Sequence, residues 1–366
     1  MLFTIEQTRL LRSLQLVERA VNDRSAMPIL ANVLLETTEK ELVITATDLD
    51  VGMKHRLPLL QSAEQGAIAL PARRLTTIIR ELPSEAVVLE AKKNHTATVS
   101  CGPSHFRIPG LPAEDFPIFP PIEPHHTLSI GQSTLKSLVA TTAFAMSLEE
   151  TRFILNGTLL QVQPGTMVLA STDGRRLAVA TARDVAGADW SARMVVPAKT
   201  IRELGRVLQD GEGQVRVTML SDNQLAFQLE DVTVVSRLLE GQFPEYERVI
   251  PPPASTTLTC SRAALTNAIR RVSLMTTAAS QAVVFEVAAD RLVILKESPE
   301  LGSAREELPA RYTGQPMAVA FNPEFWLDVL KVLEPGEVTI ELTSPDKPAM
   351  LRLPNLLYLV LPMKLA

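Results

Sequence analysis

The sequence predicts an α+β protein built from three tandem copies of one small domain, each with two helices packed on antiparallel sheets. A short β pattern that runs into an amphipathic helix occurs three times, beginning at Phe3, Leu128 and Leu258. A strand, proline, helix phrase also occurs three times, and its prolines are 126 residues apart, at Pro71, Pro197 and Pro323. A period of this length is too long for a solenoid unit and fits a whole domain.

Each copy is expected to contain two amphipathic helices. In the first helix the apolar residues Leu10, Leu14 and Val17 recur at helical spacing and form the buried stripe. The expected helices span residues 6–20, 72–82, 132–146, 198–209, 261–275 and 323–333. Ser133 is expected to cap the N-terminus of the third helix, because a serine hydroxyl can accept an orphan amide there.

About eight alternating segments per copy lie between the helical phrases and read as strands. Residues 87–90 and 96–100 flank Lys93-Asn94, and residues 215–219 and 225–228 flank Asp222-Asn223, so two hairpins are expected. The strand at 42–46 ends at Thr47-Asp48, and the strand at 168–170 leads into Thr172-Asp173. A turn-forming role is therefore expected for both aspartates.

Proline-rich segments at residues 111–124 and 243–253 separate the copies, since proline interrupts both helices and ladders. The predicted domains are residues 1–125, 126–253 and 254–366. With 46% apolar residues, three real cores are possible.

Composition also excludes several classes of protein. There is no run of eighteen apolar residues for a membrane span, and Glu6 and Arg9 interrupt any signal-peptide core. Cys101 and Cys260 lie in different copies, which favours reduced thiols and a cytoplasmic location. The adjacent His125-His126 falls in a proline-rich linker and lacks metal-ligand spacing, so we expect no metal and no cofactor.

Charge is divided between the helices and the rest of the chain. The six expected helices carry fourteen Lys or Arg and six acidic residues, a surplus of eight positive charges. Because the whole chain carries −5, the remainder carries −13. Ordinary solvated helix surfaces would explain this about as well as a function, but its repetition favours a polyanion held on one face. With three tyrosines in all, phosphate contact is favoured over base stacking.

One catalytic pattern needs to be weighed. Ser133-x-x-Lys136 and Ser221-Asp222-Asn223 resemble two motifs of serine β-lactamases and penicillin-binding proteins. The third motif, K-T-G, is missing, since Ile201 follows Lys199-Thr200. An acyl-serine hydrolase that uses Ser133 and Lys136 is therefore disfavoured, and a protein without its own catalytic site is expected.

Six short motifs, in order and correctly spaced, resemble the bacterial sliding clamp family, the β subunit of DNA polymerase III. They are PIL at 28–30, TATD at 45–48, PAR at 71–73, LNG at 155–157, TDGRRLA at 172–178 and FPEY at 243–246. The resemblance implies three DNA-clamp domains per chain and a head-to-tail homodimer that closes into a six-domain ring. The ring would encircle double-stranded DNA with its helices inside, and confer processivity on the replicative polymerase.

The resemblance also implies site residues. Arg24 and Arg73 match positions that contact DNA. Glu149 stands where a glutamine contacts DNA in the family, and Phe153 and Ile154 replace a pair of tyrosines, which weakens the contact expected from that loop. A clamp paralogue that acts mainly as a partner-binding protein is the alternative suggested by this departure.

A partner pocket between the second and third domains is implied as well. It would take short Gln- and Leu-containing peptides from replicative and translesion polymerases, the clamp loader, and mismatch-repair and ligase proteins. The matching residues are Leu155, Thr172, Gly174, Arg175, Arg176, Leu177, Pro244, Arg248, Val249, Asn322, Phe325, Val360, Leu361, Pro362 and Met363. Arg175 and Phe325 depart from the family's frequent His and Tyr, and Ala366 extends the tail by one residue.

The dimer contact implied by the resemblance joins the edge of the first domain to the third domain. Phe106 and Ile108 match one side of it, and Leu274 and Met275 match the other. Pairing would also protect an exposed strand edge from aggregation. The location implied is the cytoplasm, in association with the nucleoid.

Overall fold

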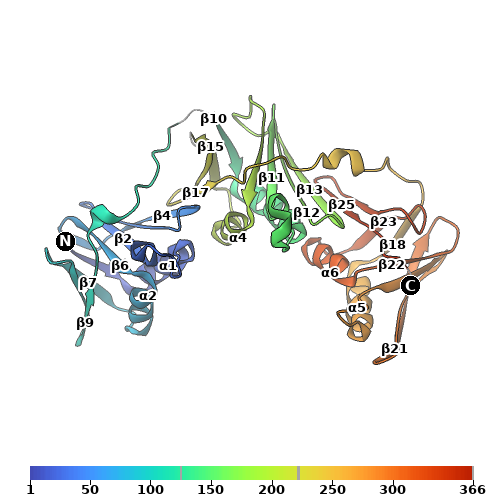
Figure 1. The fold of residues 1–366 in the computed structure, drawn as a ribbon, viewed down its shortest axis with the longest axis horizontal. Coiled ribbons are helices and arrows are strands. Elements are labelled where there is room, and N and C mark those ends of the chain that lie inside the picture. Colours follow the sequence, from blue (N-terminus) through green and yellow to red (C-terminus); the bar gives the residue numbers. More distant parts are fainter. Residues whose placement is uncertain (124–125, 221–222, 365–366) are drawn as a thin grey trace. The chain divides into compact units, whose positions relative to one another are not determined.

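The computed structural model of the chain describes residues 1–123, 126–220 and 223–364, and its helices and strands are labelled in Figure 1. The chain divides into two compact units. Unit 1 comprises Met1–Lys136, Val185–Ala188 and Lys199–Leu238, and unit 2 comprises Ser137–Asp184, Asp189–Ala198 and Leu239–Ala366. The division passes through the second copy of the repeat, so each unit contains one outer copy and a part of the central one.

Unit 1 contains two antiparallel sheets. The five-stranded sheet has the order β5-β1-β7-β8-β9, with β1 Leu2–Glu6, β5 Gln61–Glu64, β7 Ala86–Ala91, β8 Thr96–Cys101 and β9 Ser104–Pro109. The eight-stranded sheet has the order β10-β15-β16-β17-β4-β3-β2-β6, with β2 Asn32–Thr37, β3 Glu41–Thr47, β4 Val51–Pro58, β6 Gly66–Pro71, β10 His126–Gly131, β15 Gln214–Leu220, β16 Gln224–Gln228 and β17 Val232–Arg237.

Unit 2 contains one antiparallel sheet of twelve strands, in the order β14-β11-β12-β13-β25-β24-β23-β18-β21-β20-β19-β22. Its first four strands are β11 Gly157–Gln163, β12 Thr166–Thr172, β13 Arg176–Arg183 and β14 Ala192–Pro197. The others are β18 Thr257–Ser261, β19 Val283–Ala288, β20 Arg291–Ser298, β21 Gly302–Tyr312, β22 Met317–Phe321, β23 Glu337–Glu341, β24 Ala349–Arg352 and β25 Leu356–Val360.

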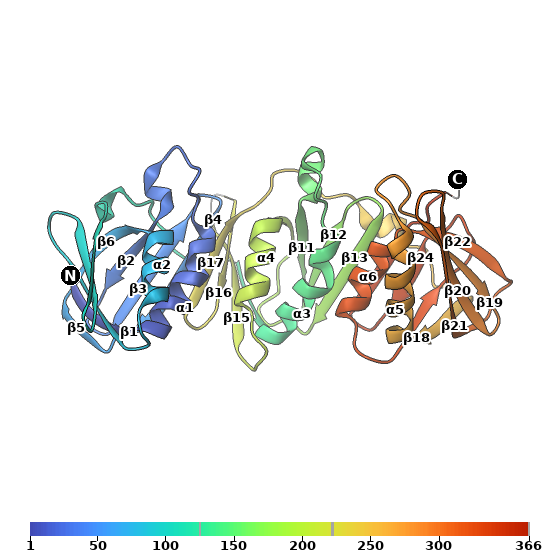
Figure 2. The ribbon, with the colours of Figure 1, turned by 90° about the horizontal axis from the view of Figure 1, so that it is seen from below.

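The six α-helices lie where the apolar periodicity predicts them. They are α1 Gln7–Val17, α2 Ala72–Glu81, α3 Gln132–Thr142, α4 Ala198–Val207, α5 Arg262–Val272 and α6 Pro323–Val332. The first helix of each copy is shorter than expected, because its last turn tightens into a 3₁₀ helix at Glu18–Ala20, Ala143–Ala145 and Ser273–Met275. Helices α1 and α2 lie side by side in unit 1, as do α5 and α6 in unit 2 (Figure 2).

The helix N-cap predicted at Ser133 is wrong. Helix α3 begins at Gln132, so Ser133 lies inside the first turn. Its hydroxyl accepts a hydrogen bond of 3.0 Å from the Gly211 amide. Lys136 forms an ion pair of 2.7 Å with Asp210, so both residues of the S-x-x-K pattern contact the segment after α4. Ser221 and Asp222 of the S-D-N pattern lie outside the described residues, as does His125 of the histidine pair.

Each unit has an apolar core built from the buried faces of its strands and helices. In unit 2 the largest buried side chain, Trp326 of α6, has its ring centroid 6.0 Å from that of Phe285 and 5.5 Å from that of Phe321. Edge and offset contacts of this kind stabilise a core beyond the area that they bury. In the described part of the chain, no helix combines the length and apolarity that crossing a bilayer would require.

Both cysteines are free thiols, and we expect neither to react in the folded protein. Burial, with Glu337 nearby, raises the pKa of Cys260 to about 12, and burial raises the pKa of Cys101 as well. The nucleophile is the thiolate, which is scarce at pH 8 when the pKa lies this high. An aromatic disulfide reagent at pH 8 should label neither thiol in the native chain and both after denaturation in guanidinium; rapid native labelling would contradict the buried assignment.

Candidate functional site

An apolar groove of about 270 Å³ lies in unit 2, where the end of β12, the segment after β17 and the end of β25 meet. Its lining residues are Leu155, Thr172, Gly174, Arg175, Arg176, Leu177, Pro244, Glu245, Tyr246, Val249, Pro348, Leu359 and Leu361. A concave apolar surface with a few polar groups at its rim is typical of a site that takes a peptide or small ligand.

The turn between β12 and β13 forms one wall of this groove. The Asp173 carboxylate accepts hydrogen bonds from the amides of Arg175 and Arg176, at 2.9 and 3.0 Å, as expected for a turn-forming aspartate. Gly174 has φ +86°, and a Cβ atom there would approach Nη1 of Arg152 to 2.5 Å. Only glycine fits this conformation and this contact without strain.

Arg176 connects this turn to the third copy of the repeat. Its guanidinium donates to Asp173 Oδ2 at 3.0 Å, to Asp328 Oδ2 of α6 at 2.6 Å and to the Phe144 carbonyl at 2.6 Å. It also lies 4.5 Å from the centroid of the Phe325 ring. Burial is the largest single influence on the Arg176 guanidinium and opposes its charge, but the nearby Tyr358, Asp328 and Asp173 together outweigh it and raise its pKa. The side chain therefore holds the groove wall against α6.

The segment after β17 forms the second wall. Tyr246 is buried, and burial together with Glu247 raises its pKa to about 12, so its ring serves as apolar surface. Val249 is 58% exposed, whereas Arg248 does not line the groove and forms an ion pair of 2.5 Å with Glu245, which does. The exposed Val249 side chain is the part of this wall that a ligand can cover.

The third wall is the C-terminal strand β25. It pairs with β13, so that Val360 lies opposite Arg176, and the Leu361 amide donates to the Arg175 carbonyl at 2.9 Å. Val360 is fully buried, while Leu361 is 40% exposed at the groove. Met363 continues past the groove, where its amide donates to the Ala320 carbonyl at 2.8 Å.

The structure brings nine of the fifteen predicted pocket residues into this groove. Those that do not line it are Arg248, Asn322, Phe325, Val360, Pro362 and Met363. Asn322 caps α6, its side chain accepting from the Glu324 amide at 2.9 Å. Sequence reasoning missed Glu245, Tyr246, Pro348 and Leu359. The first two fall inside the FPEY motif, which could have indicated them, whereas nothing near Pro348 in the sequence points to the groove.

The residues predicted at 149–154 divide between the surface and the core. Phe153 is 58% exposed, and Glu149 forms an ion pair of 3.1 Å with Arg152. Ile154 is turned the other way and packs against the cluster that contains Leu155 and Tyr246. The two residues that replace the tyrosine pair therefore do not act together, because one is exposed and the other supports the groove.

Arg24 and Arg73 lie in unit 1. Asp23 precedes Arg24 in the sequence and is the ion-pair partner of Arg73. Arg73 of α2 forms an ion pair of 2.9 Å with Asp23, so part of its charge is compensated. Arg24 is exposed and has no ion pair among the described residues. The sequence did not reveal this pairing, because Asp23 and Arg73 are fifty residues apart.

The helices contain both paired and free cations. Seven of the fourteen form ion pairs, at Arg9, Arg19, Arg73, Lys136, Lys199, Arg206 and Arg271. The exposed helix cations that pair with no described residue are Arg12, Arg74, Arg80, Arg202, Arg270 and Lys331. No adjacent carboxylate offsets the charge of a free cation or repels a phosphate beside it, so the free cations are the better candidates for phosphate contact.

The predicted interface residues differ in accessibility. Phe106 is 38% exposed on β9, the edge strand of the five-stranded sheet, whereas Ile108 is fully buried. Leu274 is 72% exposed in the 3₁₀ turn after α5, while Met275 is partly covered. Phe106 and Leu274 are thus the side chains of this set that another chain could reach.

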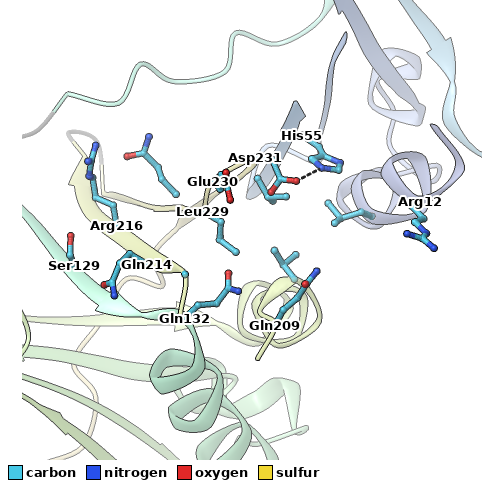
Figure 3. A pocket seen from close by; sticks show the side chains of 15 residues that line it. Arg12, His55, Ser129, Gln132, Gln209, Gln214, Arg216, Leu229, Glu230 and Asp231 are labelled. Atoms are coloured by element: carbon cyan, nitrogen blue, oxygen red, sulfur yellow. Dashed lines mark hydrogen bonds and ion pairs between the residues drawn. The ribbon is translucent and has the colours of Figure 1, made fainter. Parts of the chain in front are cut away.

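A larger polar cavity of about 650 Å³ lies in unit 1 (Figure 3). At its wall, His55 Nδ1 lies 2.8 Å from the Ser13 hydroxyl and His55 Nε2 lies 3.1 Å from Asp231 Oδ2. The arrangement has the residue types of a serine nucleophile with its base and orienting acid. However, Ser13 is completely buried, so its hydroxyl cannot reach a substrate, and the trio instead ties α1 to β4 and to the start of β17.

Together, the repeated α+β domains and the cationic helices define a class of protein, a multidomain clamp, and this one carries an apolar groove in unit 2. Three family models match the chain consecutively: DNA polymerase III beta subunit, N-terminal domain, at residues 1–120; central domain, at 129–245; and C-terminal domain, at 247–364. The chain belongs to the DNA polymerase III beta subunit family, the beta sliding clamps, which confirms the resemblance seen in the sequence.

Individual relatives agree over their whole length. The chain is 35% identical to the beta sliding clamp of Pseudomonas putida, covering 99% of this chain and 100% of the relative, and 31% identical to that of Bacillus subtilis, covering 100% of both. Among solved structures, the Pseudomonas aeruginosa DnaN sliding clamp bound to griselimycin is similar with a TM-score of 0.94 and 33% identity, covering 100% of both chains. The family is one of processivity factors.

Proposed function

We propose that the chain forms a homodimeric ring that encircles duplex DNA and makes the replicative DNA polymerase processive. Consecutive matches to all three domains of the beta subunit carry this proposal. In a ring, processivity comes from topological linkage, so tight DNA binding is unnecessary. Cationic helices attract phosphates without reading bases, which leaves the ring free to slide.

The free helix cations supply that attraction. Replacing both Arg74 and Arg80 with alanine should reduce the salt dependence of duplex binding, because each phosphate contact contributes about 0.9 to the slope of log K against log salt. We expect the slope to fall by about two, equally for unrelated duplex sequences. The matched control is Arg56→Ala, an exposed arginine on strand β4 of the same unit, which should leave the slope unchanged. An equal effect of the control would argue against a helical DNA face.

The groove of unit 2 is proposed to bind short apolar peptides of partner proteins, namely replicative and translesion polymerases, the clamp loader, and mismatch-repair and ligase proteins. Its apolar walls and exposed Val249 and Leu361 support this role. The domain boundaries 1–125, 126–253 and 254–366 and an association with the nucleoid belong to the same proposal.

The ring itself makes an all-or-none prediction. A chain loaded onto nicked circular DNA should stay bound through gel filtration and be lost once the circle is cut, because linear DNA has an end from which a ring can slide. Solution mass should correspond to a dimer, and Leu274→Glu should yield monomers that are not retained. Equal retention on cut and uncut circles would overturn the proposal.

The two alternatives have less support. A paralogue that only binds partners would show the peptide groove without retention on circular DNA. For an acyl-serine hydrolase, covalent labelling of Ser133 by a fluorophosphonate would be required, and the hydroxyl of Ser133 is occupied by the backbone of Gly211.

A further inference from the structure

The groove of unit 2 has a counterpart in unit 1, formed by the same elements one repeat earlier. The counterpart has a volume of about 260 Å³, against about 270 Å³ for the first groove. It lies beside the turn between β3 and β4, the proline-rich segment after β9, and strand β17. We call the two sites the unit 1 groove and the unit 2 groove.

The backbone arrangement is the same at both places. In unit 1 the hairpin pairs Thr47 with Gly52, and Val235 of β17 lies opposite Gly52. In unit 2 the hairpin pairs Thr172 with Leu177, and Leu359 of β25 lies opposite Leu177. The next contact is also repeated: the Arg237 amide donates to the Asp50 carbonyl at 2.8 Å, as the Leu361 amide does to the Arg175 carbonyl at 2.9 Å.

Leu49 distinguishes the unit 1 groove. Leu49 is the residue of the β3–β4 turn that corresponds to Gly174 in the β12–β13 turn. Both residues adopt the left-handed conformation, with φ +79° for Leu49 and +86° for Gly174. A leucine is strained there, whereas a glycine is not. The leucine side chain is 45% exposed and lines the groove, so the strain is not offset by burial in the core. Strain of this kind at a surface groove is typical of a functional position.

The proline-rich wall of the unit 1 groove is open for pairing. Ile118 is 92% exposed, and neither its amide nor that of Phe119 donates a hydrogen bond to a described residue. Prolines at 117, 120 and 121 keep this segment extended. An exposed extended segment beside a groove of mixed polar and apolar lining suits a peptide that adds main-chain hydrogen bonds and inserts alternate side chains.

Charges at the corner of the groove indicate the ligand's composition. Asp50 and Arg237 are both exposed there, and within the described ranges neither forms an ion pair. The neighbouring Asp48 is already neutralised by Lys199 and by its own turn. A ligand that complements one free carboxylate and one free guanidinium carries a basic and an acidic residue beside its apolar side chains.

We propose that the unit 1 groove is a second peptide-docking site, which takes an extended segment of a partner protein with apolar side chains flanked by one basic and one acidic residue. The inference rests on the proposed role of the unit 2 groove, through the shared backbone arrangement. It gives each chain two docking sites, one in each unit.

The test uses the full chain and a short fluorescein-labelled peptide with a central Leu-Leu pair flanked by a lysine and an aspartate. Fluorescence anisotropy should reveal two sites per chain. When Val249 and Leu361 are both replaced by alanine, only the unit 1 groove should still bind the peptide. Adding Ile118→Glu to this double variant should then weaken the remaining binding at least tenfold. Leu60→Glu, at another exposed apolar position of unit 1, should leave it unchanged.

Leu49→Gly separates binding from folding. It relieves the left-handed strain, so the urea midpoint should stay the same or rise, while affinity at the unit 1 groove should fall about tenfold. A single site per chain that the Val249/Leu361 change abolishes would overturn the second site and leave the unit 2 groove standing. Absence of any peptide binding, even to the unchanged chain, would overturn both.

Discussion

Replacing Arg176 with alanine is expected to lower the free energy of unfolding by about 3 kcal/mol and to weaken peptide binding in the unit 2 groove. The guanidinium is largely buried and satisfies Asp173, Asp328 and the Phe144 carbonyl. Removing one member of a buried ionic network costs about 3–5 kcal/mol, because the partners are left uncompensated. We take the lower end, because Asp328 is 42% exposed and water can replace its partner.

The measurement is urea unfolding of the full chain, with stability read from the midpoint at constant slope. Arg193→Ala is the matched control, since Arg193 forms an exposed ion pair of 2.9 Å with Glu247 in the same unit. Exposed pairs are worth about 0–1 kcal/mol, so the control should shift the midpoint little. Arg176→Lys should fall between the two, because lysine keeps one charge and loses the planar fork. Equal midpoints for Arg176→Ala and Arg193→Ala would contradict the structural role.

Truncating both Val249 and Leu361 to alanine is expected to weaken the binding of a Gln- and Leu-containing peptide by about 100-fold. The two side chains face the groove and are 58% and 40% exposed in the free chain. A ligand that covers them gains about 1–1.5 kcal/mol from each, and about 2.7 kcal/mol corresponds to two decades of affinity. Their exposure means that truncation should leave the folded state intact.

Fluorescence anisotropy with the labelled peptide provides the measurement. The matched control truncates Leu301 and Leu353, which are 48% and 44% exposed in the same unit but do not line the groove. This pair should leave affinity unchanged. A similar loss in both double variants would mean that the peptide binds elsewhere or that truncation perturbs the whole unit.

Much of the secondary structure could be predicted from local patterns. The helices appear where apolar residues recur every three or four positions, and the hairpin at Lys93-Asn94 joins β7 to β8. The tightened 3₁₀ ends of three helices were missed, because apolar spacing continues through them and does not distinguish the two kinds of turn. The cap predicted at Ser133 lies two positions after the residue that precedes α3, which is within the ordinary uncertainty of a helix boundary.

Some residues of the unit 2 groove were also predictable, because they belong to one short motif. Residues that share a motif, such as those at 172–177, stay together in the fold because one turn carries them all. The burial of Ile108, by contrast, depends on which face of β9 meets the core, and the contribution of Pro348 to the groove depends on a loop far along the chain. Neither follows from the neighbouring sequence.

The amino-acid sequence by itself determined the threefold repeat, the family, the positions of the helices and the turn-forming roles of Asp48 and Asp173, since all of these depend on local spacing. The tertiary structure alone decided which helix cations are free, how Arg176 joins the turn to α6, and that the repeat forms a second groove around Leu49. The physical reason is that ion pairs and grooves join residues that strand pairing brings together from distant parts of the chain. The spacing of residues along the chain does not predict those contacts.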